Sequence, residues 1–353
     1  MSSTSADPAS LLPRPRPASV PDAVEVRTSS RVHVTLIDMN GSAGRRDGSV
    51  GFAVADPGLR LVLARGGPLH QEEAAGAGNE RAAAAVRHAA AALGVPAPDR
   101  VRLRSTVPAH SGLGSGTQLR LAALRGLAEL EGLDLGDKEL VALSGRGGTS
   151  GIGVHAFTHG GFLVDGGHRT RDKEAFAPSR FAEGLPAPPL LYATTPPAHW
   201  GVVLALPEGV QGLEGAAERD FMTAHTPVPL PAVEAVAHTV LMGLLPALEE
   251  GDLAAFGDGL TRLQDIGWKR SHWQRAELRR WRPLVDLMRA EGAAGAGLSS
   301  TGPLVYAVYD RTRHDDGELA GRIRAAADRA GLPLVSLTTT TFGGPAATVL
   351  PEE

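Results

Sequence analysis

The chain has 353 residues, of which 42% are hydrophobic and 21% are charged, and its formal net charge at pH 7 is −4. This length allows two domains with substantial cores, and the slightly acidic balance gives no electrostatic reason to expect nucleic-acid or membrane binding. Cysteine is absent, which excludes disulfides and thiolate chemistry. No apolar run approaches the ~20 residues of a membrane span, and the N-terminus lacks a secretory signal pattern, so we expect a cytoplasmic protein.

Two changes in composition predict the domain organisation. Residues 1–24 are rich in serine and proline, which predicts a disordered tail. Proline and alanine concentrate again over Pro178–Pro197, as is typical of a linker between domains. We therefore expect an N-terminal domain over residues 25–185 and a C-terminal domain over residues 195–350.

Hydrophobic periodicity predicts strands and helices that follow one another in an irregular order. In chain order we expect the strands Ala23–Leu36, Phe52–Val54 and Leu59–Ala64, the helix Asn79–Leu93, the strand Val101–Val107, the helices Leu119–Leu133 and Asp137–Leu143, the strands Gly161–Asp165 and Val202–Leu206, the helices Pro231–Glu250, Leu253–Leu263 and Gln274–Glu291, the strand Leu304–Tyr309, the helix Glu318–Ala330 and the strand Leu334–Thr340. Pro246 and Pro283 can interrupt two of these helices. This mixture favours an α+β fold over a doubly wound sheet.

The segment Pro108–Gln118 carries the strongest local signal. Gly112, Gly114 and Gly116 alternate with Leu113, Ser115 and Thr117 directly before a predicted helix. Glycines let the backbone approach a ligand, and the first N–H groups of a helix attract anions. We expect Ser115 or Thr117 to cap this helix. No lysine follows the glycines and no G-x-G-x-x-G spacing is present, so we predict a phosphate site of neither the Walker A nor the dinucleotide type. The alternative is a glycine-rich turn that caps a buried helix.

Two further glycine segments could reach the same ligand. Gly145–Gly153 carries Arg146, Thr149 and Ser150, and a second loop rich in N–H donors favours a polyphosphate ligand. Gly295–Pro303 offers hydroxyl groups to a pocket between the domains, although a simple turn is the alternative interpretation.

The loop Asp38–Asp47 gathers Asp38, Asn40, Arg45 and Arg46 among glycines. Asp38 could hold Mg²⁺ or act as a base, and an arginine here could clamp a phosphate. The alternative is a hairpin loop that is polar because it is solvated.

Histidines and tryptophans form two other clusters. His155, His159, Asp165 and His168 lie close together in sequence; we prefer substrate hydrogen bonding or structural roles for them to a zinc site. Asp265–Trp273 places Trp268 and Trp273 beside Lys269 and Arg270. This arrangement suits a flat anionic ring, while helix surface with core indoles is the alternative.

Taken together, these motifs resemble the GHMP superfamily of small-molecule kinases from about residue 30 to residue 345. The glycine segment resembles the superfamily's phosphate loop, and GAGLSSTGP resembles its third motif. The resemblance implies a two-domain α+β fold with a ribosomal-S5-domain-2-like N-terminal domain and a ferredoxin-like C-terminal domain. Kinases of this group often carry S-G-I-D with a catalytic aspartate, whereas here Ser150, Gly151 and Ile152 precede Gly153.

LIDMNGSAGRRDG, HSGLGSGTQ and GRGGTSGIGVHAFTHGGFLVDGGH resemble the β-ribofuranosylaminobenzene 5′-phosphate synthases more specifically. Those enzymes join phosphoribosyl pyrophosphate to an aromatic carboxylic acid through a carbon–carbon bond, with loss of CO₂ and pyrophosphate. Similar enzymes make C-nucleoside antibiotics such as formycin and pyrazofurin from an aminopyrazole dicarboxylate. Gly48-Ser49 stands where the wider family reads GG.

This resemblance implies roles for particular residues, with Mg²⁺ as the cofactor. Asp38, Arg45 and Lys269 are the expected catalytic residues, and Asp38 is the expected Mg²⁺ ligand. The expected phosphate-binding residues are Gly112, Leu113, Gly114, Ser115, Gly116, Thr117, Gln118, Arg146, Gly147, Gly148 and Thr149. The expected acceptor-binding residues are His33, Asn40, Asp165, His168, Arg270, Ser300 and Thr301.

We expect a phosphoribosyl-transferring C-glycoside synthase that acts on 4-aminopyrazole-3,5-dicarboxylate, binds only small molecules and forms a homodimer. The first alternative is a synthase acting on 4-aminobenzoate or 4-hydroxybenzoate in methanopterin biosynthesis. Two remoter alternatives are a kinase of the same superfamily and a binding protein that has lost catalysis.

Overall fold

The computed structural model describes residues 14–15, 20–66, 77–107, 111–182 and 184–351. Most of the predicted tail, and the first three residues of the predicted phosphate segment, lie outside the described residues. Within the tail's range, β1 (Arg14–Pro15) pairs with β5 (Leu133–Asp134), and β2 already begins at Ala23.

The N-terminal sheet is antiparallel and is built on two long strands. Its order is β13 (Thr348–Pro351), β2 (Ala23–Asp38), β3 (Arg45–Ala64), β6 (Phe162–Asp165) and β8 (Leu190–Thr194), and β4 (Arg100–Ser105) and β7 (His168–Arg169) also pair with β3. The two strands expected at Phe52–Val54 and Leu59–Ala64 are therefore parts of one strand. An irregularity in the β2–β3 register accommodates the intervening Asp-Pro-Gly, and the pairing then resumes.

Four helices accompany this sheet, namely α1 (Ala77–Leu93), α2 (Ser115–Leu130), α3 (Asp137–Ser144) and α4 (Ile152–Thr158). Helix α2 packs on β2 and β3 with the predicted apolar face, since Leu119, Ala123, Leu127 and Leu130 are all buried. Gly126 makes the closest approach, because a Cβ there would lie 2.8 Å from Cγ2 of Val26.

The C-terminal sheet is also antiparallel. Its order is β10 (Gly295–Leu298), β11 (Val305–Asp310), β9 (Trp200–Pro207) and β12 (Leu334–Thr341). Numbered along the chain, the strands lie in the order two, three, one, four, which is the ferredoxin-like arrangement expected from the resemblance. The α+β prediction is confirmed.

Helices fill the connections of this sheet. They are α5 (Gly215–Ala224), α6 (Leu230–His238), η4 (Thr239–Leu244), α7 (Leu245–Glu250), α8 (Leu253–Arg262), η5 (Leu263–Asp265), α9 (Gly267–Trp273), α10 (Ala276–Arg279), α11 (Arg282–Ala290) and α12 (Asp316–Arg329). The short helix η3 (Ser179–Phe181) lies earlier in the chain, between β7 and β8. Pro246 stands in the first turn of α7 without breaking the run from Leu230 to Glu250. The expected helix Gln274–Glu291 is instead divided, and Pro283 lies in the first turn of α11.

By length and composition, the helix Leu230–Glu250 could cross a membrane, contrary to the expectation that no apolar run is long enough. About a third of its most apolar window, 33%, is buried inside the protein. The buried side chains Val236, Val240 and Leu244 belong to the main hydrophobic core. One face of the helix therefore packs on the core, while Leu241 and Met242 on it are exposed.

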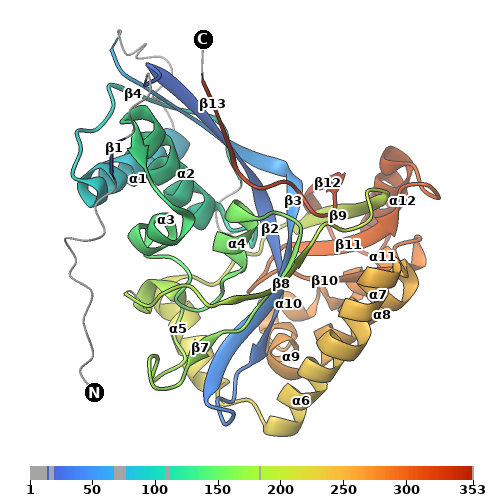
Figure 1. The fold of residues 1–353 in the computed structure, drawn as a ribbon. Helices are drawn as coiled ribbons and strands as arrows, with labels where there is room; N and C mark the ends of the chain where they lie inside the picture. Colours follow the sequence, from blue (N-terminus) through green and yellow to red (C-terminus); the bar gives the residue numbers. More distant parts are fainter. Residues whose placement is uncertain (1–13, 16–19, 67–76, 108–110, 183, 352–353) are drawn as a thin grey trace.

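The two sheets share that core. Strands β2 and β3 run through the middle of the molecule, with α1–α3 on one side and α6–α9 on the other (Figure 1). Phe52 of β3 stacks on Phe342 at 4.2 Å between ring centroids and meets Tyr306 of β11 at 5.6 Å. The predicted linker Pro178–Pro197 contains β8, which joins the N-terminal sheet, and β13 returns the end of the chain to the same sheet.

A glycine comparison tests the packing of α2. Leucine at Gly126 would press on Val26 and Leu63, so Gly126→Leu should lower the free energy of unfolding by about 1–3 kcal/mol. Gly321 is an exposed glycine of α12, and none of the described heavy atoms lies within 4 Å of the place that its Cβ would occupy. Because leucine favours a helix more than glycine does, Gly321→Leu should raise the free energy of unfolding by up to about 1 kcal/mol. Urea denaturation of both variants measures the difference; equal effects would contradict the close approach of α2.

Candidate active site

Strand β2 is fastened to the first glycine segment through Arg31. The Arg31 backbone N–H donates to the carbonyl of Leu113 at 3.1 Å, and Nη1 donates to the carbonyl of Gly112. Gly114 has φ 82°, and a Cβ there would lie only 3.0 Å from Cγ of Arg31. The glycine therefore lets the loop close over the arginine. Sequence reasoning did not identify Arg31, because no local pattern marks a strand residue that contacts a loop eighty residues later.

The glycine segment opens onto a cavity of about 410 Å³, which we call the phosphate cavity. It is lined by Arg31, Arg81, Gly112, Gly114, Ser115, Gly116, Thr117, Arg146, Ser179, Leu213, Glu214, Glu218, Ser300, Thr301 and Gly302. Three arginines reach it from three different elements, and a Cβ on Gly116 would lie 2.7 Å from Nη2 of Arg146. A guanidinium thus lies against the first turn of α2. Cations and a helix start at one place form an anion site.

The expected cap of α2 by Ser115 or Thr117 is wrong. The N-cap is Gly114 in a left-handed conformation, and no side chain accepts a hydrogen bond from the first turn. The hydroxyl-bearing residues Ser115 and Thr117 line the cavity instead. The N–H groups of Thr117 and Gln118 donate to the carbonyl of Gly114, so a ligand would meet the N–H groups that precede them in the first turn.

Two carboxylates also line the phosphate cavity. Glu214 is the N-cap residue of α5 and Glu218 lies in its first turn. Burial lowers the pKa of Arg31 to about 10, although the charge of Glu218 acts in the opposite direction. Acidic groups beside an anion site are the arrangement in which a divalent cation can bridge protein and phosphate.

A second cavity of about 120 Å³ adjoins the first, and we call it the ring cavity. It is lined by Arg31, His33, Leu36, Thr149, Ser150, Pro178, Ser179, Glu218, Phe221, Met222, Trp268, Lys269, His272, Ser300 and Thr301. Arg31, Ser179, Glu218, Ser300 and Thr301 line both cavities. A ligand in one cavity can therefore contact a ligand in the other.

Aromatic side chains form one wall of the ring cavity. The His272 ring stacks on Phe221 with centroids 4.8 Å apart, and Trp268 meets His272 edge-on at 5.0 Å. The predicted aromatic wall is thus present at Trp268 but not at Trp273. Trp273 is buried in the C-terminal core, where its indole N–H donates to Oε1 of Gln264 at 3.1 Å.

Lys269, which the sequence predicted as a catalytic residue, lines the ring cavity. Its Nζ donates to the carbonyls of Leu298 at 2.9 Å and Ser300 at 2.8 Å. Burial, with a smaller effect from the Arg31 charge, lowers the pKa of Lys269 to about 7. Its neighbour Arg270 is exposed and lines neither cavity.

Two histidines complete this cavity. His33 is 7% exposed and His272 is 1% exposed. In the described part of the chain, Nδ1 of His33 and both ring nitrogens of His272 have no hydrogen-bond partner. Burial first, and then nearby cations, hold the pKa of each ring well below its usual value. Both imidazoles are therefore neutral near pH 7.

Several predicted phosphate-binding residues serve the framework instead. Leu113 is buried in the core, and the side chain of Gln118 donates to the carbonyl of Gly153 at 2.8 Å. Gly147 and Gly148 pack against Ala187 and Ala182 and line neither cavity. Of the second glycine segment, Arg146 reaches the phosphate cavity and Thr149 the ring cavity.

Asp165 and His168 were predicted to bind the acceptor, but each belongs to a buried network that contacts the second glycine segment. Asp165 is fully buried and accepts hydrogen bonds from Ser49, Gly151 and Gly167, and burial raises its pKa to about 6. His168 shares the carboxylate of Asp47 with the buried Lys173. Within the described residues, no group of three or more His, Cys, Asp or Glu side chains is arranged so that it could hold a metal ion.

The structure does not bring Asp38, Asn40 or Arg45 to either cavity. Asp38 Oδ1 accepts from the backbone of Asn40 and Gly41, both at 2.8 Å, and the Asn40 side chain donates to the carbonyl of Val228. Arg45 clamps the carbonyls of Gly166 at 2.6 Å and Gly167 at 2.7 Å. These contacts hold the loop Asp38–Asp47 in place.

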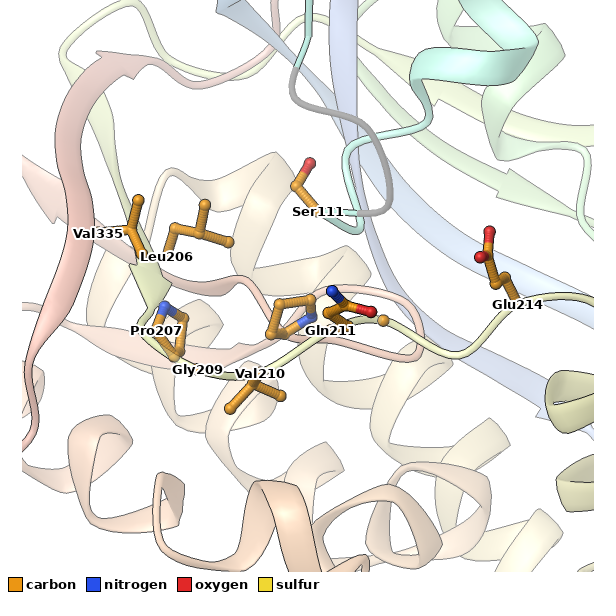
Figure 2. A pocket seen from close by; sticks show the side chains of 10 residues that line it. Ser111, Leu206, Pro207, Gly209, Val210, Gln211, Glu214 and Val335 are labelled. Carbon is orange, nitrogen blue, oxygen red and sulfur yellow. The ribbon is translucent and has the colours of Figure 1, made fainter.

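A third cavity of about 670 Å³ adjoins the phosphate cavity at Glu214, which lines both. Figure 2 shows Leu206, Pro207 and Val335 toward one end of it and Glu214 toward the other. Its described lining offers no cation, so its chemistry differs from that of the phosphate cavity.

Comparison with known proteins agrees with this geometry. The family descriptions "GHMP kinases N terminal domain" and "GHMP kinases C terminal" match residues 80–161 and 244–331. The fold resembles homoserine kinase from Cytophaga hutchinsonii, with a TM-score of 0.65 and 16% identity, covering 94% of this chain and 99% of that one. It also resembles mevalonate diphosphate decarboxylase from Enterococcus faecalis, with a TM-score of 0.57 and 12% identity, covering 94% and 99% of the two chains. At these identities the likeness concerns the fold alone.

Relatives with higher sequence identity indicate the family more specifically than the fold does. A β-ribofuranosylphenol 5′-phosphate synthase of Methanothermobacter thermautotrophicus is 39% identical over 309 residues, covering 84% of this chain and 91% of that protein. Proteins of the same name from Archaeoglobus fulgidus and Methanocaldococcus jannaschii are 40% and 35% identical, over 81% of this chain and 88% and 89% of theirs. With its two joined cavities and GHMP-kinase fold, this chain belongs to the β-ribofuranosylphenol 5′-phosphate synthase family.

Proposed function

We propose that the protein joins phosphoribosyl pyrophosphate to an aromatic carboxylic acid through a carbon–carbon bond and releases CO₂ and pyrophosphate. The observation that carries the proposal is the junction of the two cavities at Arg31. One cavity has the arginines and helix start that suit a pyrophosphate, and the other has the aromatic wall that suits a ring. The two substrates can therefore meet where the cavities join.

The name of the relatives favours a particular acceptor. An acceptor that ends as a phenol after losing its carboxylate is a hydroxybenzoate, so we propose 4-hydroxybenzoate, with 4-aminobenzoate as its close analogue. The aminopyrazole dicarboxylate that was expected from the sequence has no support from these relatives. It remains a second acceptor to be tested.

The reaction balances without an external oxidant or base at the ring carbon. The bond from the anomeric carbon to pyrophosphate breaks, and its electron pair leaves with pyrophosphate. The ring carbon that bears the carboxylate attacks the anomeric carbon. The bond to the carboxylate then breaks, CO₂ leaves, and the electron pair returns to the ring and restores its aromaticity. The loss of CO₂ takes the place of the loss of a proton.

This chain's residues have distinct tasks in the proposal. Arg31, Arg146 and the first turn of α2 bind the departing pyrophosphate and stabilise its growing charge. Lys269 and Arg31 attract the acceptor carboxylate toward the junction. Of the neighbouring cations Lys269 and Arg270, we assign the carboxylate-binding role to Lys269, because it lines the ring cavity and Arg270 does not.

A magnesium ion fits the acidic side of the phosphate cavity. Magnesium is commonly held by one or two carboxylates together with substrate phosphates, and Glu214 and Glu218 are the carboxylates that line the cavity. When bound, the ion would neutralise negative charge on the leaving pyrophosphate. We therefore propose Glu214 and Glu218, in place of Asp38, as the residues that hold it.

The kinase alternative rests on the fold alone. A Cβ on Gly153 would lie 3.1 Å from Cγ2 of Thr117, so a side chain at this position would point toward the phosphate cavity. Kinases with the S-G-I-D pattern place their catalytic aspartate there, and this chain has none. Release of ADP from ATP in the presence of an alcohol would revive the kinase alternative.

The decisive experiment incubates the protein with Mg²⁺, phosphoribosyl pyrophosphate and one acceptor at a time. The acceptors are 4-hydroxybenzoate, 4-aminobenzoate and 4-aminopyrazole-3,5-dicarboxylate, each isotopically labelled at the carboxyl carbon. We expect mass spectrometry to find a ribosylated product without the label, and labelled CO₂ and pyrophosphate in equal amounts. A product that retains the carboxylate, or no product from any acceptor, would contradict the proposal.

Glu218→Gln tests the magnesium assignment. Removing one of two ligand charges should raise the Mg²⁺ concentration needed for half-maximal activity by about tenfold or more. Glu234→Gln, on the exposed side of α6, is the matched control and should change nothing. Activity is measured as pyrophosphate release against Mg²⁺ concentration; an unchanged requirement in Glu218→Gln would refute the assignment.

The pKa of Lys269 predicts how acceptor binding depends on pH. The ammonium form predominates below about pH 7 and the neutral amine above it, while the acceptor carboxylate stays ionised. The affinity for 4-hydroxybenzoate should therefore fall by up to about tenfold between about pH 6 and about pH 8. In Lys269→Met the affinity should be low and independent of pH. Isothermal titration calorimetry checks this, and a flat wild-type profile would show that Lys269 does not bind the carboxylate.

A further inference from the structure

Three buried nitrogen atoms at the ring cavity have no hydrogen-bond partner among the residues that the structure describes. They are Nδ1 of His33 and both ring nitrogens of His272. Each of these rings is more than nine-tenths buried and lines the cavity. Most buried polar atoms in folded proteins are paired, so unpaired ones at a cavity wall indicate a polar ligand group that belongs there.

The protonation state of the two imidazoles indicates which kind of ligand group would pair with them. A neutral imidazole carries one N–H donor and one acceptor nitrogen. Burial and the nearby charges of Lys269, Arg31 and Arg275 keep both rings neutral. The matching ligand group is one that both donates and accepts a hydrogen bond. A phenolic hydroxyl does both, and an aromatic amine donates strongly and accepts weakly.

The position along β2 agrees with this match. Arg31 and His33 are two residues apart on a regularly paired part of the strand, so both face the cavity about 6.6 Å apart along the chain. That distance is comparable with the length of a benzoic acid from its carboxylate to its opposite substituent. The cavity volume of about 120 Å³ is similar to the roughly 150 Å³ of a cavity that admits benzene.

The wall composition fixes the orientation of the ring. Phe221 and Trp268 provide apolar contact for its faces and edges, and Arg31, which lines both cavities, attracts the carboxylate toward the phosphate cavity. With the carboxylate at that end, the opposite substituent reaches the unpaired histidine nitrogens.

We propose that His33 and His272 recognise the hydroxyl or amino substituent opposite the carboxylate of the aromatic acceptor. The inference rests on the proposed function, because it adds a specificity determinant to the acceptor site. Both histidines are positioning residues that select acceptors by hydrogen bonding. An acceptor with a methyl group in this place leaves the nitrogens unpaired and binds more weakly.

A hydrogen bond from the substituent to a neutral imidazole also has a chemical consequence. It increases the electron density that the oxygen or nitrogen donates into the ring. That density reaches the carbon directly opposite, which is the carbon that attacks the anomeric centre. The same contact that selects the acceptor thus helps to activate it.

Binding, measured without turnover, tests the proposal. Calorimetry in the presence of Mg²⁺ and pyrophosphate compares 4-hydroxybenzoate with 4-methylbenzoate, which has nearly the same shape but no hydrogen-bonding substituent. The wild-type protein should prefer the hydroxyl compound by about tenfold or more. A preference of less than about twofold would overturn the proposal without the need for any variant.

Variants assign the preference to the histidines. His272→Phe keeps the stacking on Phe221 but removes both nitrogens, so it should bind 4-methylbenzoate as before and lose most of the preference. His272→Gln restores a donor and an acceptor and should recover part of it. The exposed His238→Gln is the control and should keep the full preference. A full preference in both His272→Phe and His33→Leu would overturn the assignment.

The outcomes separate this inference from the proposed function. A histidine-dependent preference in a protein that forms no carbon–carbon bond with any acceptor would support the recognition site and contradict the synthase. Product formation with no preference between the two ligands would support the synthase and contradict the recognition site.

Discussion

The attachment of Arg31 to the first glycine segment is the contact on which the site depends. One arginine fixes the loop through the carbonyls of Gly112 and Leu113 and still lines both cavities. The constraint requires a glycine at position 114, where a side chain would collide with the arginine stem. Because β2 also carries His33, the same strand sets the distance between the phosphate cavity and the far end of the ring cavity. In the proposed reaction, a single strand would therefore position both substrates.

The parts of the structure that follow from local physics were predictable from the sequence. The apolar face of α2 and the glycine alternation before it fix a helix and a tight approach, and both are present. The cap of α2 was not predictable in this way, because a serine after a glycine satisfies the same local rule whether it caps the helix or faces a ligand. The single strand β3 also escaped prediction, since its pairing with β2 continues across a polar Asp-Pro-Gly that locally signals a turn.

In the candidate site, too, residues marked by a local pattern were predicted, and residues that depend on tertiary contacts were not. Lys269, Ser300 and Thr301 were identified because charge, aromatic neighbours or a glycine-rich motif marked them. Arg31, Glu218 and Phe221 were missed, since each lies in an ordinary strand or helix and becomes part of the site only through contacts between distant segments. Asp38 and Arg45 look functional in sequence, but backbone groups of adjacent loops occupy them. Polar residues among glycines indicate either a ligand site or a loop held by its own hydrogen bonds, and only tertiary contacts distinguish the two.

The most direct test of the account is a crystal structure of the protein with Mg²⁺, pyrophosphate and 4-hydroxybenzoate bound together. We predict pyrophosphate against the first turn of α2, in contact with Arg31 and Arg146, and the benzoate ring beside Trp268 with its carboxylate directed toward the pyrophosphate. The result that would contradict the account is pyrophosphate bound at the loop Asp38–Asp47, or a benzoate that lies outside the ring cavity.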